Sequence, residues 1–147
     1  MQSIFKKKII RYNIGRIVMK EILFRGKTLN TGKWVEGHYC KYPHQFAGFL
    51  EPHIFVSSYD AETEMGSCTA YPVVQDTVQQ FTGLFDRNGK KIFEGDIVEN
   101  TTDHSTAVVH WYEEHSAFML YSELKNRVYF LYDNDFKIID VIGNIND

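Results

Sequence analysis

Residues Gln79–Val98 read QQFTGLFDRNGKKIFEGDIV, and this stretch is the strongest indication of the fold. The pair Asn88-Gly89 tolerates the positive φ angles of a type I′ turn, so the sequence predicts a tight β-hairpin here. A second turn is expected at Glu94-Gly95-Asp96, before a new strand. The flanking apolar residues that need a core are Phe81, Leu84, Phe85, Ile92 and Phe93. We therefore expect one β-hairpin turn that connects two β strands rich in aromatic residues.

The rest of the chain continues this pattern of short strands and turns. We expect strands at Glu21–Arg25, Trp34–Tyr42, Phe46–Leu50, His53–Ser57, Asp96–Asn100, Thr106–Tyr112, Ala117–Ser122, Val128–Tyr132 and Phe136–Ile142. The polar stretch Tyr59–Gly66 is expected to form a surface loop. A short helix over Leu124–Tyr132 is an open alternative to the strand there. Turn signals at this spacing are typical of a sandwich or small barrel.

The predicted fold class is mainly β, with short antiparallel strands, little helix, and two small β subdomains that share a core. The absence of alternating long helices disfavours a parallel α/β sheet. From Gly95 onward the order of elements resembles an SH3-like barrel, a likeness that says little about function. We divide the chain into a basic extension outside the fold (1–18), an N-terminal β subdomain (19–75) and a C-terminal SH3-like subdomain (76–147).

The charge is distributed unevenly along the 147 residues. The net charge is −3, but residues 1–18 contain five of the 16 Lys and Arg and no acid. The remaining 11 stand against 19 Asp and Glu, which gives −8 for residues 19–147. An acidic body disfavours nonspecific binding of nucleic acid. The basic extension leaves open an arm that binds nucleic acid or anionic lipid.

The cellular compartment is inferred from cysteine usage and hydropathy. Two cysteines, Cys40 and Cys68, are too few for a disulfide framework and indicate a reducing cytoplasm. No run of 18 apolar residues exists, so we expect no transmembrane helix and no membrane partner. Arg11, Asn13 and Arg16 interrupt the apolar residues of the N-terminal segment, which therefore does not resemble a signal peptide.

Two groups of residues are candidates for a metal or catalytic site. The soft and imidazole ligands His38, Cys40, His44 and Cys68 would suit zinc, but their spacing differs from that of structural zinc sites. A second group surrounds one turn and consists of His110, Glu113, Glu114 and His115. Hydrolysis would require acids that converge on an open position, and nothing else in the sequence pairs with this group. We predict no metal site, no cofactor and no catalytic residue.

The carboxylates and tryptophans allow two further interpretations. Asp86, Glu94 and Asp96 suit a paired-carboxylate role, but turn chemistry explains them better, because Asp86 and Asp96 can each accept local backbone hydrogen bonds. If Gly95 has a positive φ, a valine there should destabilise the fold by roughly 1–3 kcal/mol. Trp34 and Trp111 suggest a stacking platform for single-stranded bases, whereas a core role is the simpler interpretation.

Three segments of the chain together resemble the YopX family, small proteins of bacteriophages and prophages. The first matching segment is Lys20–Arg25, and the second runs from Thr82-Gly83-Leu84 through Asp86, Asn88-Gly89-Lys90 and Ile92 to Glu94–Val98. The third is Val141–Ile145. Gln79 and Phe85 depart from the family pattern, in which a glycine and a polar residue are usual. The resemblance carries no activity that can be assigned residue by residue.

We therefore expect a non-enzymatic phage or prophage accessory protein that acts by binding in the cytoplasm of a bacterial host. Short edge strands and abundant aromatic residues favour a homo-oligomer, and a host protein is a further candidate partner. Two alternatives remain open. One is a nucleic-acid-binding module built on the C-terminal half, and the other is an acidic decoy of a host DNA-binding protein. An enzyme would require a deep pocket lined by His110, Glu113 or Glu114.

Overall fold

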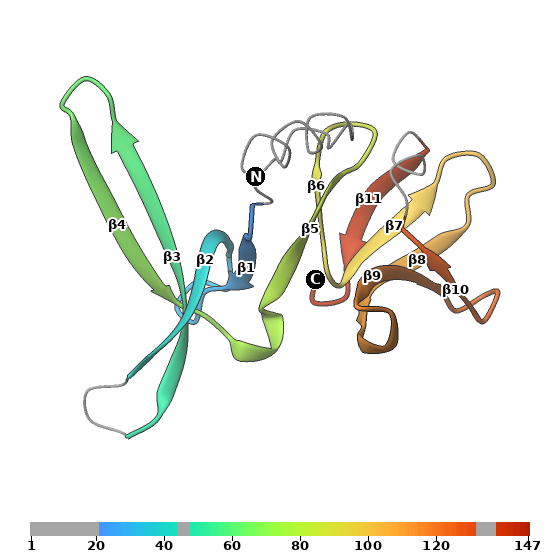
Figure 1. The fold of residues 1–147 in the computed structure, drawn as a ribbon, viewed down its shortest axis with the longest axis horizontal. Helices are drawn as coiled ribbons and strands as arrows, with labels where there is room; N and C mark the ends of the chain where they lie inside the picture. Colours follow the sequence, from blue (N-terminus) through green and yellow to red (C-terminus); the bar gives the residue numbers. More distant parts are fainter. Residues whose placement is uncertain (1–20, 44–47, 132–137) are drawn as a thin grey trace, which may run out of the picture.

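The computed structural model of the chain describes residues 21–43, 48–131 and 138–147. These residues form a mainly β protein, and none of them lies in an α-helix. They build two antiparallel sheets, one of six strands and one of five (Figure 1). Within the described part of the chain, no helix has the length and apolar character to cross a membrane.

The first sheet has the strand order β4-β3-β2-β1-β5-β6. Its strands are β1 (Phe24–Lys27), β2 (Trp34–Pro43), β3 (Leu50–Asp60), β4 (Met65–Pro72), β5 (Gln79–Phe85) and β6 (Lys91–Phe93). A single 3₁₀ turn, η1 (Gln75–Thr77), connects β4 to β5. Figure 1 shows β3 and β4 as a long ribbon that projects away from the second sheet.

The second sheet has the order β10-β9-β8-β7-β11. Its strands are β7 (Asp96–Asn100), β8 (Thr106–Tyr112), β9 (Ala117–Ser122), β10 (Arg127–Phe130) and β11 (Ile139–Asn144), with a 3₁₀ turn, η2 (Glu113–His115), between β8 and β9. The outer strands β10 and β11 do not pair with each other, so the predicted SH3-like barrel is wrong. A barrel closes only through a ladder between its outer strands, and β10, whose four residues are all exposed, pairs with β9 alone.

The central hairpin is present, but its turn differs from the predicted type I′. Gly89 has a φ of 79°, whereas Asn88 is not among the described residues with positive φ. Asp86 N donates to Lys90 O at 2.8 Å, which leaves three loop residues, the arrangement of a type I turn followed by a left-handed glycine. The Asp86 carboxylate accepts bonds from the backbone N–H groups of Asn88 (2.9 Å) and Lys90 (2.8 Å) and so holds this turn.

The region around Tyr59–Gly66 forms two strand ends rather than the predicted loop. The ladder of β3 and β4 runs without a shift from His53 opposite Pro72 to Asp60 opposite Met65, so only residues 61–64 form the turn. Polar composition was misleading because the backbone pairing, and not burial, supports this hairpin. Likewise Leu50–Asp60 is one strand, where two were expected around Pro52.

Two other strand predictions depart from the structure or lie outside the described residues. Arg127–Phe130 is a strand, so the alternative helix over Leu124–Tyr132 is wrong. Part of the strand expected at Phe46–Leu50, and the first residues of the one expected at Phe136–Ile142, lie outside the described residues.

The two sheets share part of one core. A buried cluster joins Ile92 of β6 to the second sheet, and its other members are Val98, Val109, Leu120 and Ile139. A smaller cluster consists of Phe81 and Phe93 of the first sheet and Leu23, which directly precedes β1. Strands of the first sheet lie on both sides of the domain boundary that is predicted between residues 75 and 76. That boundary stays a prediction. The predicted extension, 1–18, is outside the described residues.

Candidate binding surface

A buried ion pair lies where the two sheets meet. Arg25 of β1 donates through Nη2 to the carboxylate of Asp96, the first residue of β7. Asp96 is 1% exposed, and its second oxygen accepts the backbone N–H of Phe93 at 2.8 Å. The guanidinium of Arg25 lies 4.7 Å from the ring centre of Trp34 and 4.4 Å from that of Phe93. The charge is therefore neutralised by a carboxylate and held by two aromatic faces.

Two buried amides extend this ion pair to the last strand. Gln79 of β5 and Asn144 of β11 exchange side-chain hydrogen bonds of 3.0 Å in both directions. Arg25 donates to Gln79 Oε1 at 2.9 and 3.0 Å, and Asn144 donates to Asp96 at 3.0 Å. We call Arg25, Gln79, Asp96 and Asn144 the polar clamp. The strands β1 and β5 of the first sheet and β7 and β11 of the second each supply one member, so the clamp ties the two sheets together.

A second tie joins the tip of the β5–β6 hairpin to β11. The Asp86 carboxylate accepts the backbone N–H of Val141 at 3.1 Å. Arg87 forms a bidentate pair with Asp140, at 2.6 and 2.7 Å, and Asn88 donates to the same carboxylate at 2.9 Å. This pair raises the pKa of Arg87 and lowers that of Asp140, chiefly through the hydrogen bond between them. The Asp86 turn therefore also serves as a contact between the sheets.

The polar clamp offers no position for a reacting molecule, because its members are bonded to one another and to the backbone. Asp96 and Asp86 accept local backbone hydrogen bonds, as turn chemistry suggested, but each also reaches a distant strand. Glu94 contributes its backbone N–H to Gln80 O at 2.9 Å and is not a member of the clamp. These groups hold the architecture, which leaves the exposed surface for recognition.

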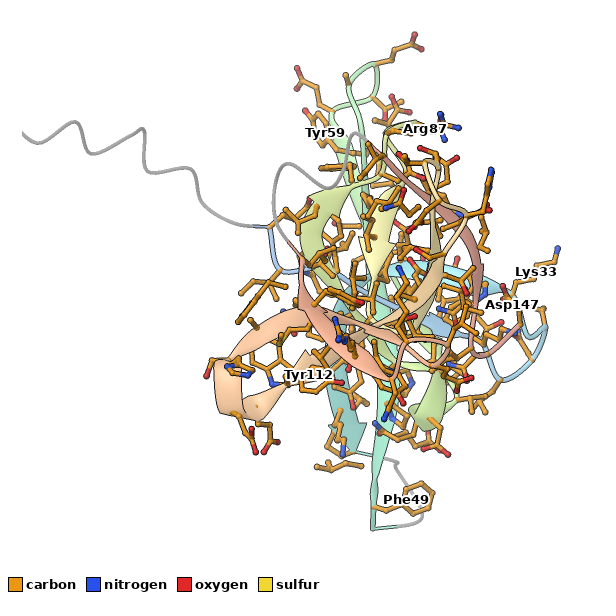
Figure 2. The ribbon with its side chains drawn as sticks, turned by 90° about the vertical axis from the view of Figure 1, so that its right-hand side faces the viewer. Lys33, Phe49, Tyr59, Arg87, Tyr112 and Asp147 are labelled. Atoms are coloured by element: carbon orange, nitrogen blue, oxygen red, sulfur yellow. The ribbon has the colours of Figure 1, made fainter. Side chains whose placement is uncertain are left out.

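The most exposed part of the described chain is the ribbon of β3 and β4. Every residue from Ser57 to Ala70 is exposed, including Tyr59 at 68% and Met65 at 70%. Figure 2 places Tyr59 and the similarly exposed Phe49 at opposite ends of the molecule, near the two tips to which β3 extends. We call residues 56–70 the β-arm. A two-stranded ribbon with both faces in water is only marginally stable on its own.

The outer edge of the β-arm carries backbone groups that no described strand pairs. Val73 N donates to Pro52 O at 3.0 Å, which fixes the alternation of the β3–β4 ladder. By that alternation residues 67, 69 and 71 of β4 face β3, and the N–H and C=O groups of Gly66, Cys68 and Ala70 point outward. β4 is the terminal strand of its sheet, and the loop residue Leu29 donates only to Pro72 O, at its far end.

The residues weighed for zinc are not brought together. Cys40 lies opposite His53 in the β2–β3 ladder, and Cys68 lies opposite Ser57 in the β3–β4 ladder. His44 lies outside the described residues. No three described histidines, cysteines or acids are grouped as metal ligands. Both cysteines are exposed free thiols.

The residues weighed for hydrolysis lie at the surface around η2. Glu113, Glu114 and His115 are exposed, and His115 packs against Phe130 with ring centres 5.4 Å apart. His110 lines a shallow hollow with Trp111, Tyr112 and Tyr121, and neither glutamate is part of that lining. Of the tryptophans, Trp34 stacks on Arg25, and Trp111 meets Phe118 edge-on at 5.0 Å.

Sequence reasoning missed the polar clamp and the β-arm. Arg25, Asp96 and Asn144 fall within the three segments that carry the family resemblance, and this convergence was the available signal. Gln79, one of the two departures from that pattern, is also a member, and like Asp96 it bonds to both Arg25 and Asn144. For the β-arm, the signal was a strand without charges that follows an acidic turn.

Comparisons with known proteins agree with this architecture. A family model described as "YopX protein" matches residues 23–147. A crystal structure of protein EF1440 from Enterococcus faecalis is similar in fold, with a TM-score of 0.53 and 24% sequence identity. The likeness covers 86% of this chain and 94% of that one. No curated protein matches the sequence.

Proposed function

The chain belongs to the YopX family, and we propose that it acts by binding, as a non-enzymatic accessory protein of a phage or prophage, with a second copy of itself as its first partner. The observation that supports this proposal is the unpaired edge of β4. Natural proteins block such edges with lysines, prolines, bulges or very short strands. Met65–Tyr71 contains no charged residue and no proline, and its ladder with β3 has no bulge.

A two-fold pairing of β4 with its copy would use all the outward backbone groups. In an antiparallel arrangement centred on Cys68, the residue opposite Cys68 is Cys68 of the second copy, and Gly66 lies opposite Ala70. Each outward N–H then meets an outward C=O. Along the β-arm the product has four adjacent strands, which supplies the neighbours that the two-stranded β-arm lacks.

Charge favours a second copy over nucleic acid. Within the β-arm the charged residues are Asp60, Glu62 and Glu64, all at the tip, and an acidic surface repels phosphates. In the pairing centred on Cys68 the tip of each copy extends beyond Tyr71 of the other, so the acidic turns do not meet. The same edge would also accept an extended, uncharged segment of a host protein by strand addition.

Proline substitution tests the edge without disturbing the hairpin. Cys68→Pro removes an outward N–H while the groups that pair with β3 remain, and Cys68→Ser is the matched control that keeps the N–H. By light scattering at micromolar concentration we expect dimers for the natural sequence and for Cys68→Ser, and monomers for Cys68→Pro.

The outcomes separate the two parts of this proposal. A monomeric natural protein at that concentration would contradict self-association. Dimers of a folded Cys68→Pro, checked by circular dichroism, would keep self-association but exclude the β4 edge as its site.

A further inference from the structure

The turn at the tip of the β5–β6 hairpin contains an asparagine followed by a glycine, the pair in which asparagine loses its side-chain amide most readily. Asn88 and Gly89 are both exposed. The backbone nitrogen of the glycine can approach the side-chain carbonyl carbon of the asparagine, because glycine has no side chain that blocks the path. A Cβ built at Gly89 has no atom within 4 Å, so the surrounding fold also leaves this position open.

The reaction that joins these two groups is deamidation, and it needs only water. The Gly89 nitrogen forms a bond to Cγ of Asn88, and its proton leaves with the side-chain amide as ammonia. Water then opens the resulting succinimide ring at either of its two carbonyl groups. The products are an aspartate and an isoaspartate at position 88.

The structure restrains both groups that this reaction requires. The Asn88 side chain donates through Nδ2 to Asp140 Oδ1 at 2.9 Å. The Gly89 N–H donates to Asp86 O at 3.0 Å. The Gly89 nitrogen must leave Asp86 to attack, and the Asn88 amide must leave Asp140 to depart as ammonia. Breaking each of these hydrogen bonds therefore adds to the barrier of the reaction.

Conversion of Asn88 would undo the contact between the hairpin tip and β11. The product carboxylate cannot donate to Asp140 and repels it, because both are negative. An isoaspartate also adds one carbon to the main chain between the N–H groups of residues 88 and 90, which Asp86 Oδ1 accepts together at 2.9 and 2.8 Å. The same carboxylate holds the Val141 N–H at 3.1 Å, so distortion of this turn reaches β11.

We propose that Asn88 is a deamidation site, that Asp140 and Asp86 slow its reaction in the folded protein, and that conversion releases the hairpin tip from β11. The site lies outside the β-arm and is separate from the self-association proposed above. The failure of either proposal would leave the other untouched.

The rate of conversion is measured by mass spectrometry of peptides from the full-length protein after incubation in mildly alkaline buffer. We expect the urea-denatured chain to react at least about tenfold faster than the folded protein, since both hydrogen bonds are lost. Asp140→Ala should accelerate the folded protein about threefold to tenfold, the effect of one hydrogen bond. Arg87→Met is the matched control, because it removes the same ion pair but leaves the bond from Asn88 to Asp140, and its rate should stay within about twofold of the natural one.

Three results would overturn the restraint. The first is an equal rate for the folded and the denatured natural chain, a comparison that needs no variant. The second is the natural rate in a folded Asp140→Ala protein. The third is an acceleration by Arg87→Met as large as that by Asp140→Ala, which would transfer the restraint from the Asn88 hydrogen bond to the ion pair.

Hydrogen exchange of the Val141 amide tests the release of the tip. The converted protein is isolated by ion exchange, because it carries an additional negative charge. Its Val141 N–H should exchange faster than in the natural protein. The Gly95 N–H, which donates to Val109 O at 2.7 Å, is the control and should exchange as before. An unchanged exchange rate of Val141 in the converted protein would contradict the release.

Discussion

Gly95 shows how one residue position constrains the junction of the sheets. It has a φ of 76°, and a Cβ built there would lie 2.3 Å from Gln79 Nε2 and 3.2 Å from Ile145 Cδ1. Its N–H donates to Val109 O at 2.7 Å, and its carbonyl accepts from Ile145 N at 3.0 Å. Gly95 therefore has the positive φ on which the predicted effect of a valine depends. In addition, Gln79 of the polar clamp occupies the space that a side chain at this position would need.

A pair of valine substitutions separates backbone strain from displacement of the clamp. Gly95→Val should cost about 1–3 kcal/mol of strain and a further loss as Gln79 moves. Gly89→Val is the control, because Gly89 has a φ of 79° and nothing within 4 Å of its built Cβ, so only strain applies. Urea unfolding should show a larger loss for Gly95→Val. Equal losses would contradict the role given to Gln79.

The ion pair of Arg25 and Asp96 can be compared with a surface pair of the same chemistry. Arg25→Met leaves a buried carboxylate without its cation and should cost about 3–5 kcal/mol. Arg87→Met removes the exposed pair with Asp140, in which the Arg87 side chain is 47% exposed, and should cost about 0–1 kcal/mol. The measurement is the free energy of unfolding in urea, and similar costs for the two variants would refute the clamp as the main tie.

At the scale of elements, the turn between β7 and β8 has a testable response to pH. The hydroxyl and N–H of Ser105, and then Lys125, lower the pKa of Asp103 from 3.8 to about 2. Because the pKa in the folded state lies below the unfolded value, this carboxylate contributes stability above about pH 4, and the contribution is lost as pH falls from about 4 to about 2. Ser105→Ala removes the largest cause, so NMR titration of Asp103 should show a pKa closer to 3.8; an unchanged pKa would contradict this assignment.

The strands were predictable where local chemistry decides them. Thr106–Tyr112 and Ala117–Ser122 are apolar runs on either side of the polar turn Glu113–Ser116, and both are strands with these bounds. The hairpin at Asn88-Gly89 was predictable, but its turn type was not, because Asp86 selects it through two backbone hydrogen bonds. The loop prediction for Tyr59–Gly66 was wrong because strands that are exposed on both faces have no apolar pattern in their sequence.

The polar clamp depends on contacts that no local pattern contains. Its four members are far apart in the chain, and single residues such as Arg25 and Asn144 have the composition of ordinary strand ends. The closed barrel was expected from element order alone, which does not determine whether β10 and β11 meet. The zinc group was weighed on residue type, and the ladders separate Cys40 from Cys68 on different strands.

At the scale of the whole molecule, the contacts between the two sheets do not include the β-arm. The polar clamp and the Asp86 turn hold the sheets together, whereas the β-arm extends from them with both faces and one edge in water (Figure 1). The junction of the sheets is fixed by hydrogen bonds and ion pairs, whereas the edge of β4 is exposed. This arrangement suits a protein that acts by binding a partner chain. We therefore propose that the β4 edge pairs with a second copy.

Spin labelling at Cys68 measures that pairing most directly. The label is attached to Cys68 in Cys40→Ser, and to Cys40 in Cys68→Ser as the control. Pairing centred on Cys68 places the two labelled backbones at a cross-strand separation of about 5.5 Å between Cα atoms, so we expect strong dipolar broadening of the Cys68 spectrum, which disappears on dilution with unlabelled protein. A Cys68 spectrum without broadening, from protein that light scattering shows to be associated, would contradict the account.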